Sequence, residues 1–292
     1  MRKGYYTALG TPLDGSGNVI EASLRKHAED QAAAGASGLL AMGSMGIQPQ
    51  IKDSQFVKVA KITAEAVQRQ TPVFVGVMDN SVARVKARIE SLSGLPLDGV
   101  VATTPYYYAL TQDEVLRFFT ELAETSEFPL YLYDLPGVTK TKIAASTAQK
   151  LMSVRNIAGI KSGDLPTVRT LARVQQQTNP AFELLFSGLD VFDAAYEYGI
   201  EKNLDGMFSC TLPLANKLYG SLEAGEKEAA SAALDGIILL RDTFVEVGVF
   251  PGFSYAMNVL GYEGDFAPDY APKLNEQQAL KVRDCMEKLA LL

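Results

Sequence analysis

Lys161 is the residue whose type and position point most directly to chemistry. It follows the apolar run Ile157–Ile160, which is typical of a short buried strand, and small and polar turn residues come after it. A buried ammonium group costs free energy unless it is paired or loses its proton. Lys161 could therefore extend to solvent, with its stem covering the strand end. The alternative is a desolvated amine that attacks a carbonyl and forms a Schiff base.

Two further features suit Schiff-base chemistry. Tyr133 ends another apolar run, and its phenol could donate and accept protons beside an iminium, although it could also be an aromatic plug. In the segment Gly43-Ser44-Met45-Gly46, backbone N–H groups and a hydroxyl could converge on a small carboxylate, although an ordinary turn has the same composition. Together these features predict carbon–carbon bond cleavage or formation, with the iminium as electron sink.

Other candidate residues have simpler interpretations beside the functional ones. Tyr106-Tyr107-Tyr108 lies in a predicted loop and could make a hydrophobic contact within the chain or between subunits. Asp190 precedes a helical pattern, so it could cap a helix or bind hydroxyls of a polyol. His27 is the only histidine and is expected to be a satisfied core or surface residue, which leaves Ser-His-Asp catalysis and zinc sites poorly supported. No metal or cofactor is expected.

The elements that would position these groups alternate between short apolar strands and amphipathic helices. The strand starts are spaced by roughly the length of one βα unit. Near-continuous apolar strands indicate a parallel sheet covered on both faces. Eight such units predict an α/β fold, a closed (β/α)8 TIM barrel. The candidate strands are Tyr5–Leu9, Gly38–Met42, Val73–Val77, Gly99–Thr103, Leu130–Asp134, Ile157–Ile160, Phe182–Phe186 and Gly206–Ser209.

The competing open sheet is disfavoured because no G-x-G-x-x-G follows the first strand. We expect residues 1–221 to form the catalytic barrel and residues 222–292 to form a C-terminal helical extension packed on it. The expected helices of that extension are Ser221–Val247, Gly252–Leu260 and Asn275–Leu291. In such barrels the chemistry lies at the carboxyl ends of the strands.

Bulk properties narrow the class of partner. The 292 residues carry a formal net charge of -7, which argues against nucleic-acid binding. The longest uncharged run is rich in glycine, alanine and serine and does not predict a membrane helix, and no secretory signal is expected. The two cysteines, Cys210 and Cys285, are expected to be free thiols, which fits a reducing, cytoplasmic setting.

With these residues in view, the chain resembles the dihydrodipicolinate synthase/N-acetylneuraminate lyase family of pyruvate-dependent class I aldolases. The resemblance covers essentially the whole length. Four segments carry it in order, matching the family's G-[ST]-[ST]-G-E, T-P-Y-Y, Y-x-x-P and G-[IVT]-K patterns: Gly43-Ser44-Met45-Gly46, Thr104-Pro105-Tyr106-Tyr107, Tyr133-Asp134-Leu135-Pro136 and Gly159-Ile160-Lys161.

The resemblance implies roles for these residues. Lys161 would form the imine with pyruvate, Tyr133 would shuttle protons, and Tyr107 would reach the site of a neighbouring subunit. The partners would be a small 2-oxo acid and an aldehyde or sugar acid, and the usual assembly is a homotetramer built as a dimer of dimers. The expected substrate-binding residues are Gly43, Ser44, Met45, Gly188, Asp190 and Ser209.

Several positions depart from the family pattern. Met45 removes a hydroxyl from the loop, Ile47 replaces the usual glutamate, and Val138 stands where the synthases have an arginine. Gly188 and Asp190 resemble the lyase branch, but Val191 replaces its glutamate. The turn after Lys161 is also shorter than usual. These differences argue against the lysine-biosynthetic synthase and favour an N-acetylneuraminate-lyase-like aldolase. Synthase-type condensation, a 2-keto-3-deoxy acid dehydratase and a catalytically silent 2-oxo-acid-binding relative are the alternatives.

Overall fold

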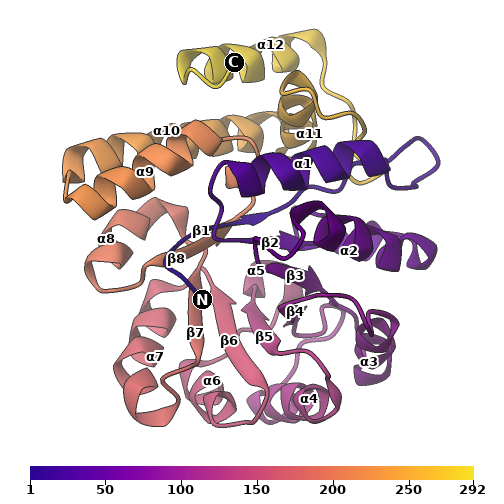
Figure 1. Cartoon of the computed structure of the whole chain (residues 1–292), viewed down its shortest axis with the longest axis vertical. Helices are drawn as coiled ribbons and strands as arrows, with labels where there is room; N and C mark the ends of the chain where they lie inside the picture. The colour runs from indigo at the N-terminus through magenta and orange to yellow at the C-terminus, as the bar shows by residue number, and fades with distance from the viewer. The chain divides into compact units, whose positions relative to one another are not determined.

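The computed structural model describes residues 1–292, and its eight strands follow one another in sequence order around a closed parallel barrel. The (β/α)8 TIM-barrel prediction is therefore confirmed (Figure 1). Most strand residues are buried, as expected for apolar strands covered by helices. The strands are β1 Gly4–Ala8, β2 Gly38–Ala41, β3 Val73–Gly76, β4 Gly99–Thr103, β5 Leu130–Asp134, β6 Ile157–Ser162, β7 Glu183–Phe186 and β8 Lys202–Asp205.

Helices alternate with the strands and then continue alone to the C-terminus. Helix α4 shows why they form, because a capping box of Thr111 and Glu114 begins it and a buried apolar stripe includes Val115 and Phe119. The helices are α1 Glu21–Ala33, α2 Asp53–Val67, α3 Val82–Ser91, α4 Gln112–Thr125, α5 Pro136–Thr139, α6 Ala145–Met152, α7 Leu165–Thr178, α8 Phe192–Glu197, α9 Leu212–Ala224, α10 Lys227–Val247, α11 Val249–Val259 and α12 Glu276–Lys288. The 3₁₀ segments are η1 Gln48–Gln50, η2 Leu189–Val191 and η3 Met207–Ser209.

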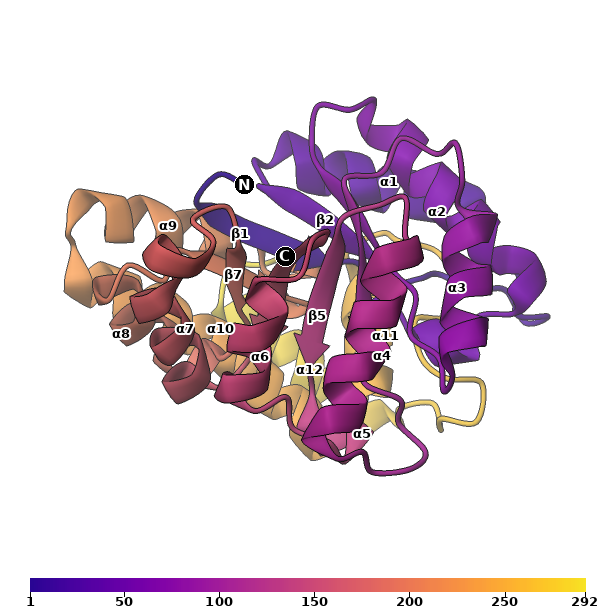
Figure 2. The ribbon, with the colours of Figure 1, turned by 90° about the horizontal axis from the view of Figure 1, so that it is seen from below.

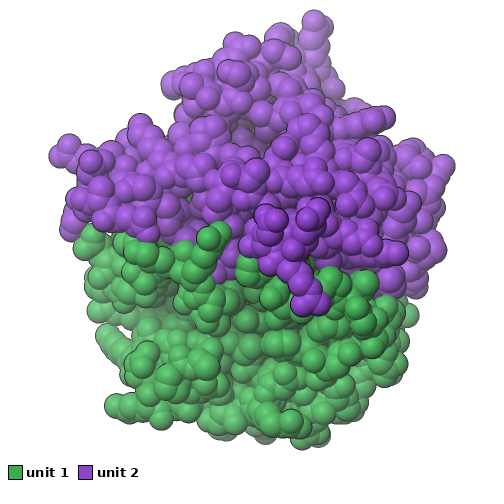
Figure 3. All heavy atoms as spheres, viewed as in Figure 1, with its two compact units in different colours: residues 1–3, 72–204 green, residues 4–71, 205–292 purple.

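The chain divides into two compact units (Figure 3). Unit 1 comprises residues 1–3 and 72–204, and unit 2 comprises residues 4–71 and 205–292. Within unit 1, β4, β5, β6 and β7 pair in order. Helix α4 packs against α3 on one side and α6 on the other, on the outer face of these strands (Figure 2). Within unit 2, β1 pairs with β2, and α10 packs against α9, α11 and α12. No helix is long and apolar enough to cross a membrane.

The expected boundary at residue 221 stays a prediction. It falls inside α9, and the helices after it are α10, α11 and α12, close to the ranges expected from the sequence. Both cysteines are free, as predicted, with Cys210 buried and Cys285 half-buried.

Two local predictions are wrong. Strand β6 continues to Ser162, so Lys161 lies inside the strand rather than at its end. Strand β8 begins four residues before the predicted Gly206–Ser209. That segment instead turns, because Asp205 Oδ1 accepts the Met207 amide at 2.9 Å and such local bonds compete with a strand ladder. Asp190 lies within η2, two residues before α8 begins, and its expected capping role stays a prediction.

His27 is confirmed as a core residue, fully buried on α1 with Tyr262 and Phe266 against its ring. The expectation that it is satisfied is wrong, because neither ring nitrogen has a hydrogen-bond partner. Burial lowers the pKa of His27 to about 3, against the opposing effects of the Gly10 backbone and Asp30. The histidine is therefore neutral in the folded chain at neutral pH. Once unfolded, it regains its ordinary pKa of about 6.5.

We predict that His27 makes the fold acid-sensitive. The pKa of His27 is lower in the folded state than in the unfolded state, so protonation favours the unfolded state. Below about pH 6.5 the free energy of unfolding therefore falls by about 1.4 kcal/mol per pH unit. His27→Leu should remove this slope, so its stability relative to the wild type should improve by about 2 kcal/mol between about pH 6.5 and pH 5. Urea unfolding at both pH values measures the change. Lys26, Asp30 and Tyr262 remain in both proteins, and parallel pH profiles would contradict the prediction.

Candidate active site

Lys161 and Tyr133 form a buried pair, each one residue before the carboxyl end of its strand. They are register partners of β6 and β5, and the Lys161 Nζ lies 3.9 Å from the centroid of the Tyr133 ring. Their exposed fractions are 5% and 4%, so Lys161 does not extend to solvent. An ammonium group over an aromatic face gains cation–π attraction, and a neutral amine there has a phenol beside it. This pair can therefore combine a nucleophile with a proton-transfer group.

Thr103 on β4 extends this layer of side chains. It is the register partner of Tyr133, and Leu185 of β7 is the partner of Lys161 on the other side. Neighbouring residues at the same register point to the same face, so these four line one face of the sheet. The Thr103 hydroxyl is buried and has no hydrogen-bond partner. Thr103 ends the predicted strand Gly99–Thr103, but nothing in the sequence shows that it is in register with Tyr133.

The loop that follows β2 in unit 2, residues 42–47, has the features of an anion-binding turn; we call it the β2 loop. Ser44 and Met45 are half-buried, and the amides of Met45 and Gly46 donate no hydrogen bond within the chain. The Ser44 carbonyl accepts the Ile47 amide at 3.1 Å, which closes the turn. The Gly46 carbonyl accepts the Thr11 hydroxyl at 2.8 Å. Two unoccupied amides in a tight turn suit a small carboxylate.

Backbone strain accompanies this loop. Met42 and Ile47 have φ values of 53° and 47°, and the β-branched Ile47 is an outlier in that left-handed region. Such strain persists only where the surroundings impose it, and it clusters at functional sites. Met45 packs against Gly206, because a Cβ added at Gly206 would come within 2.8 Å of the Met45 Cβ. The Ser209 hydroxyl is buried and donates to the Ala8 carbonyl at 3.1 Å, so it braces β1.

The remaining expected residues lie in loops of unit 1. Gly188 approaches the turn after β6 so closely that a Cβ there would meet the Gly163 carbonyl at 2.9 Å. Asp190 and Val191 are exposed next to it. Tyr107 is 69% exposed, and its ring packs edge-on against Tyr108.

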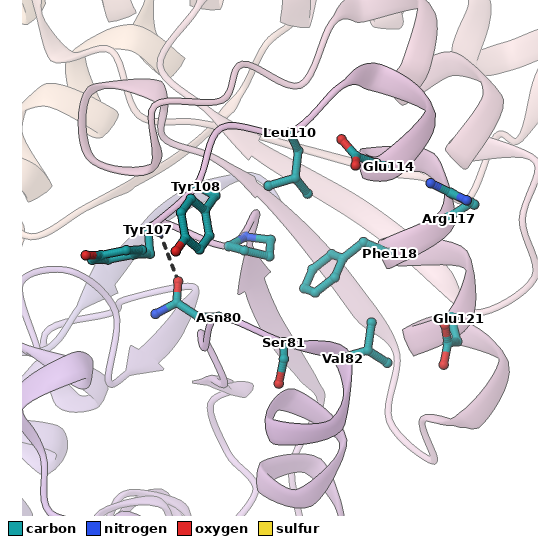
Figure 4. A pocket seen from close by; sticks show the side chains of 11 residues that line it. Asn80, Ser81, Val82, Tyr107, Tyr108, Leu110, Glu114, Arg117, Phe118 and Glu121 are labelled. Carbon is teal, nitrogen blue, oxygen red and sulfur yellow. Dashed lines mark hydrogen bonds between the residues drawn. The ribbon is translucent and has the colours of Figure 1, made fainter.

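The tyrosine loop is held in place by Asn80, whose side-chain carbonyl accepts the amides of Tyr106 and Tyr107 at 2.9 and 3.0 Å. Tyr107 and Tyr108 line an open pocket of about 620 Å³, with Phe118 and Arg117 of α4 facing them (Figure 4). Neither Lys161 nor Tyr133 lines this pocket. The pocket is therefore lined by the tyrosine loop and α4 and does not include the buried Lys161–Tyr133 pair.

A further polar cluster lies one residue beyond the buried pair. Asp134 does not cap the turn that follows it; its carboxylate accepts the Ser162 hydroxyl at 2.9 Å and pairs with Lys142, which also pairs with Asp164 at 2.8 Å. Burial opposes the charges, but these hydrogen bonds prevail, raising the pKa of Lys142 and lowering that of Asp164. No group of three or more His, Cys, Asp or Glu residues is arranged to hold a metal ion.

Solved structures define the class of fold to which this barrel belongs. The structure of YagE, a prophage protein of the dihydrodipicolinic acid synthase family from E. coli K12, in complex with pyruvate, superimposes with a TM-score of 0.91 and 19% identity, covering 100% of both chains. A dihydrodipicolinate synthase from Thermotoga maritima gives 0.89 and 21%, again over 100% of both chains. A monomeric dihydrodipicolinate synthase variant gives 0.88 and 21%, over 99% of this chain and 97% of that one.

Sequence comparison then identifies the family. The dihydrodipicolinate synthetase family matches residues 1–288, and the chain belongs to it. The 4-hydroxy-tetrahydrodipicolinate synthase of Acidiphilium cryptum is 29% identical over 100% of both chains. That of Porphyromonas gingivalis is 31% identical over 71% of this chain and 68% of its own.

We predict that the β2 loop depends on Gly46 for its geometry. A Cβ on Gly46 would lie 2.8 Å from the Leu9 carbonyl oxygen and 2.9 Å from the Met42 amide nitrogen, and neither backbone atom can move aside cheaply. Gly46→Ala should therefore destabilise the fold by about 2 kcal/mol or more. Gly15→Ala is the matched control, because its Cβ would meet nothing within 4 Å. Equal melting temperatures for the two variants would contradict the prediction.

Proposed function

We propose that this protein is a pyruvate-dependent class I aldolase or lyase in which Lys161 forms a Schiff base. The observation that carries the proposal is the buried Lys161–Tyr133 pair, with 3.9 Å between the amine and the ring centroid. Family membership supports it, because the matched relatives are named as synthases of this family. The amine can act as the nucleophile and the phenol as a proton-transfer group, and imine chemistry on a 2-oxo acid uses one group of each kind.

The proposed reaction follows from these two groups. The neutral Lys161 amine adds to the C2 carbonyl of pyruvate, and loss of water leaves an iminium at C2. Tyr133 moves protons between the carbonyl oxygen, the leaving water and C3, and loss of a C3 proton gives an enamine that attacks an aldehyde. In the reverse direction, a 2-keto-3-deoxy acid is cleaved to the aldehyde and the enamine. Hydrolysis then releases pyruvate and restores the Lys161 amine.

The proposal extends to the groups that would hold the substrate. The Ser44 hydroxyl and the free amides of Met45 and Gly46 suit the pyruvate carboxylate. The unpartnered Thr103 hydroxyl, in register with Tyr133, suits an oxygen of the substrate, because an unsatisfied buried hydroxyl gains from any partner. Gly188 and Asp190 remain proposed contacts for hydroxyls of a sugar acid. With Val138 exposed, no arginine stands at that position for a second carboxylate, which favours a lyase-like acceptor.

We predict that borohydride traps pyruvate on Lys161. Intact-mass and peptide analysis should show one reduced pyruvate adduct per chain on that residue. Lys161→Ala should abolish the adduct. Tyr133→Phe should still bind pyruvate but turn over about 10²–10⁴-fold more slowly, the range for loss of a general acid–base group.

The matched control for the lysine is Lys86→Ala, which removes a lysine of an ion pair on α3 and should leave trapping unchanged. If neither pyruvate nor any other small 2-oxo acid gives an adduct on Lys161, the proposed function is wrong. The acceptor is found by incubating the enzyme with N-acetylneuraminate and a panel of 2-keto-3-deoxy acids and measuring released pyruvate. Synthase-type condensation and dehydration are assayed in parallel on the same preparation.

A catalytically silent 2-oxo-acid-binding protein is the second candidate. Met45 and Ile47 favour it, since they remove a hydroxyl and a carboxylate from the β2 loop where the family pattern has them. It predicts calorimetric binding of 2-oxo acids without turnover. Pyruvate release from any member of the panel would exclude it.

For assembly, we propose a homotetramer built as a dimer of dimers, with the exposed Tyr107 and Tyr108 in one of its interfaces. Sedimentation should then give four times the 31.5 kDa chain mass. Replacing both tyrosines by serine should yield smaller species. Tyr270→Ser, at a side chain that is 77% exposed, is the matched control and should leave the mass unchanged. A monomeric wild type would contradict the proposal.

A further inference from the structure

A polar cluster lies back to back with the Lys161–Tyr133 pair; we call Asp134, Lys142, Ser162 and Asp164 the outer cluster. Asp134 and Ser162 are register partners, one residue beyond Tyr133 and Lys161 on the same two strands. Successive side chains of a strand point to opposite faces of the sheet. The outer cluster therefore begins on the face opposite the one from which the amine and the phenol project.

Hydrogen bonds in the cluster join the ends of β5 and β6 directly. The Asp134 carboxylate is 1% exposed and accepts the Ser162 hydroxyl at 2.9 Å. It also accepts the Ile143 amide at 3.0 Å and pairs with the Lys142 ammonium. Each of its two oxygens thus has a donor, as a buried carboxylate requires.

The same cluster reaches the start of α7. The Asp164 amide donates to the Ser162 hydroxyl at 3.2 Å, and the Asp164 carboxylate pairs with Lys142 at 2.8 Å and accepts the Thr167 hydroxyl at 2.6 Å. Lys142 is the only cation in the cluster, and it bridges two carboxylates from different strand ends. Removing it would leave the buried Asp134 charge without its counter-ion, which is strongly destabilising.

We propose that the outer cluster, through Lys142, positions the Lys161 amine over Tyr133 for the reaction proposed above. This inference rests on the proposed function, and Lys142 acts here as a positioning residue. Catalytic groups must be held within a fraction of an ångström, and a displacement of about 1 Å can cost 10²-fold in rate. A hydrogen bond between Asp134 and Ser162 joins the two strands one residue beyond the pair. A displacement within the outer cluster should therefore also displace Lys161 and Tyr133.

The test compares Lys142→Met, Lys142→Arg and the control Lys86→Met. Lys86 is a good match because it also pairs with a carboxylate, Glu121 at 3.0 Å, and is partly exposed like Lys142. The kcat for pyruvate release or condensation is expressed per Lys161 trapped by borohydride, which removes any unfolded fraction. Lys142→Met should lower this kcat about tenfold or more while KM for the 2-oxo acid changes less than about threefold. Lys142→Arg should recover part of the loss, and Lys86→Met should behave as the wild type.

A merely structural role predicts a different result. Lys142→Met would then lower the melting temperature but leave kcat per trapped site unchanged, and that outcome overturns the proposal. If Lys142→Met does not fold, Ser162→Ala provides the test, because it keeps both carboxylates paired with Lys142 and removes the hydroxyl that bonds to Asp134 and accepts the Asp164 amide. Ser162→Ala should slow the reaction about threefold or more, and an unchanged kcat overturns the proposal.

A second readout keeps the positioning inference separate from the proposed function. Formaldehyde with cyanoborohydride methylates lysine amines without any substrate, and peptide mass analysis gives the rate at Lys161. Loosening of the pair should change this rate about threefold or more in Lys142→Met or Ser162→Ala, but not in Lys86→Met. If the wild type traps no 2-oxo acid, the proposed function fails, and the methylation rates still decide the positioning role. Equal rates in all variants overturn it.

Discussion

The proposed chemistry depends on one physical constraint, that a lysine amine is buried without an opposing carboxylate on its own face of the sheet. Lys161 meets this constraint with the face of Tyr133, its register partner on β5. An aromatic face attracts the lysine side chain without placing a full negative charge beside it. The arrangement keeps the Lys161 amine over the Tyr133 ring, with both side chains largely shielded from solvent.

The carboxylates that could have paired with Lys161 lie on the other face. Asp134 and Asp164 are bound to Lys142, so the two faces of the same strand ends carry different electrostatics. The alternation of side chains along β5 and β6 is what separates them. One face of these strand ends thus carries Lys161 over an aromatic ring, and the opposite face carries carboxylates that pair with Lys142 from a loop.

Much of this arrangement could be predicted from the sequence. The βα spacing and apolar strands predict the barrel, and the positions of Tyr133 and Lys161 at the ends of successive strands predict their proximity. The outer cluster could not be predicted, because Lys142 comes from a loop whose path no periodicity describes. The displacement of β8 was missed for a similar reason, since Asp205 forms a local turn that competes with the apolar run after it.

Burial was harder to predict than topology. From the sequence, Lys161 could have been exposed or buried, and the difference depends on whether packing closes around a strand that continues to Ser162. Likewise, the strain at Ile47 follows from tertiary contacts of the β2 loop rather than from any preference of isoleucine. The proposed site residues of this chain therefore include positions where local sequence preference and the final structure disagree.

The most direct test of the central claim is a crystal structure of the protein soaked with pyruvate. The buried amine–phenol pair predicts continuous density between the Lys161 Nζ and C2 of pyruvate, with the Tyr133 hydroxyl within hydrogen-bond distance of the adduct. Pyruvate bound without a covalent link, or linked to a different lysine, would contradict the assignment of Lys161 as the Schiff-base residue.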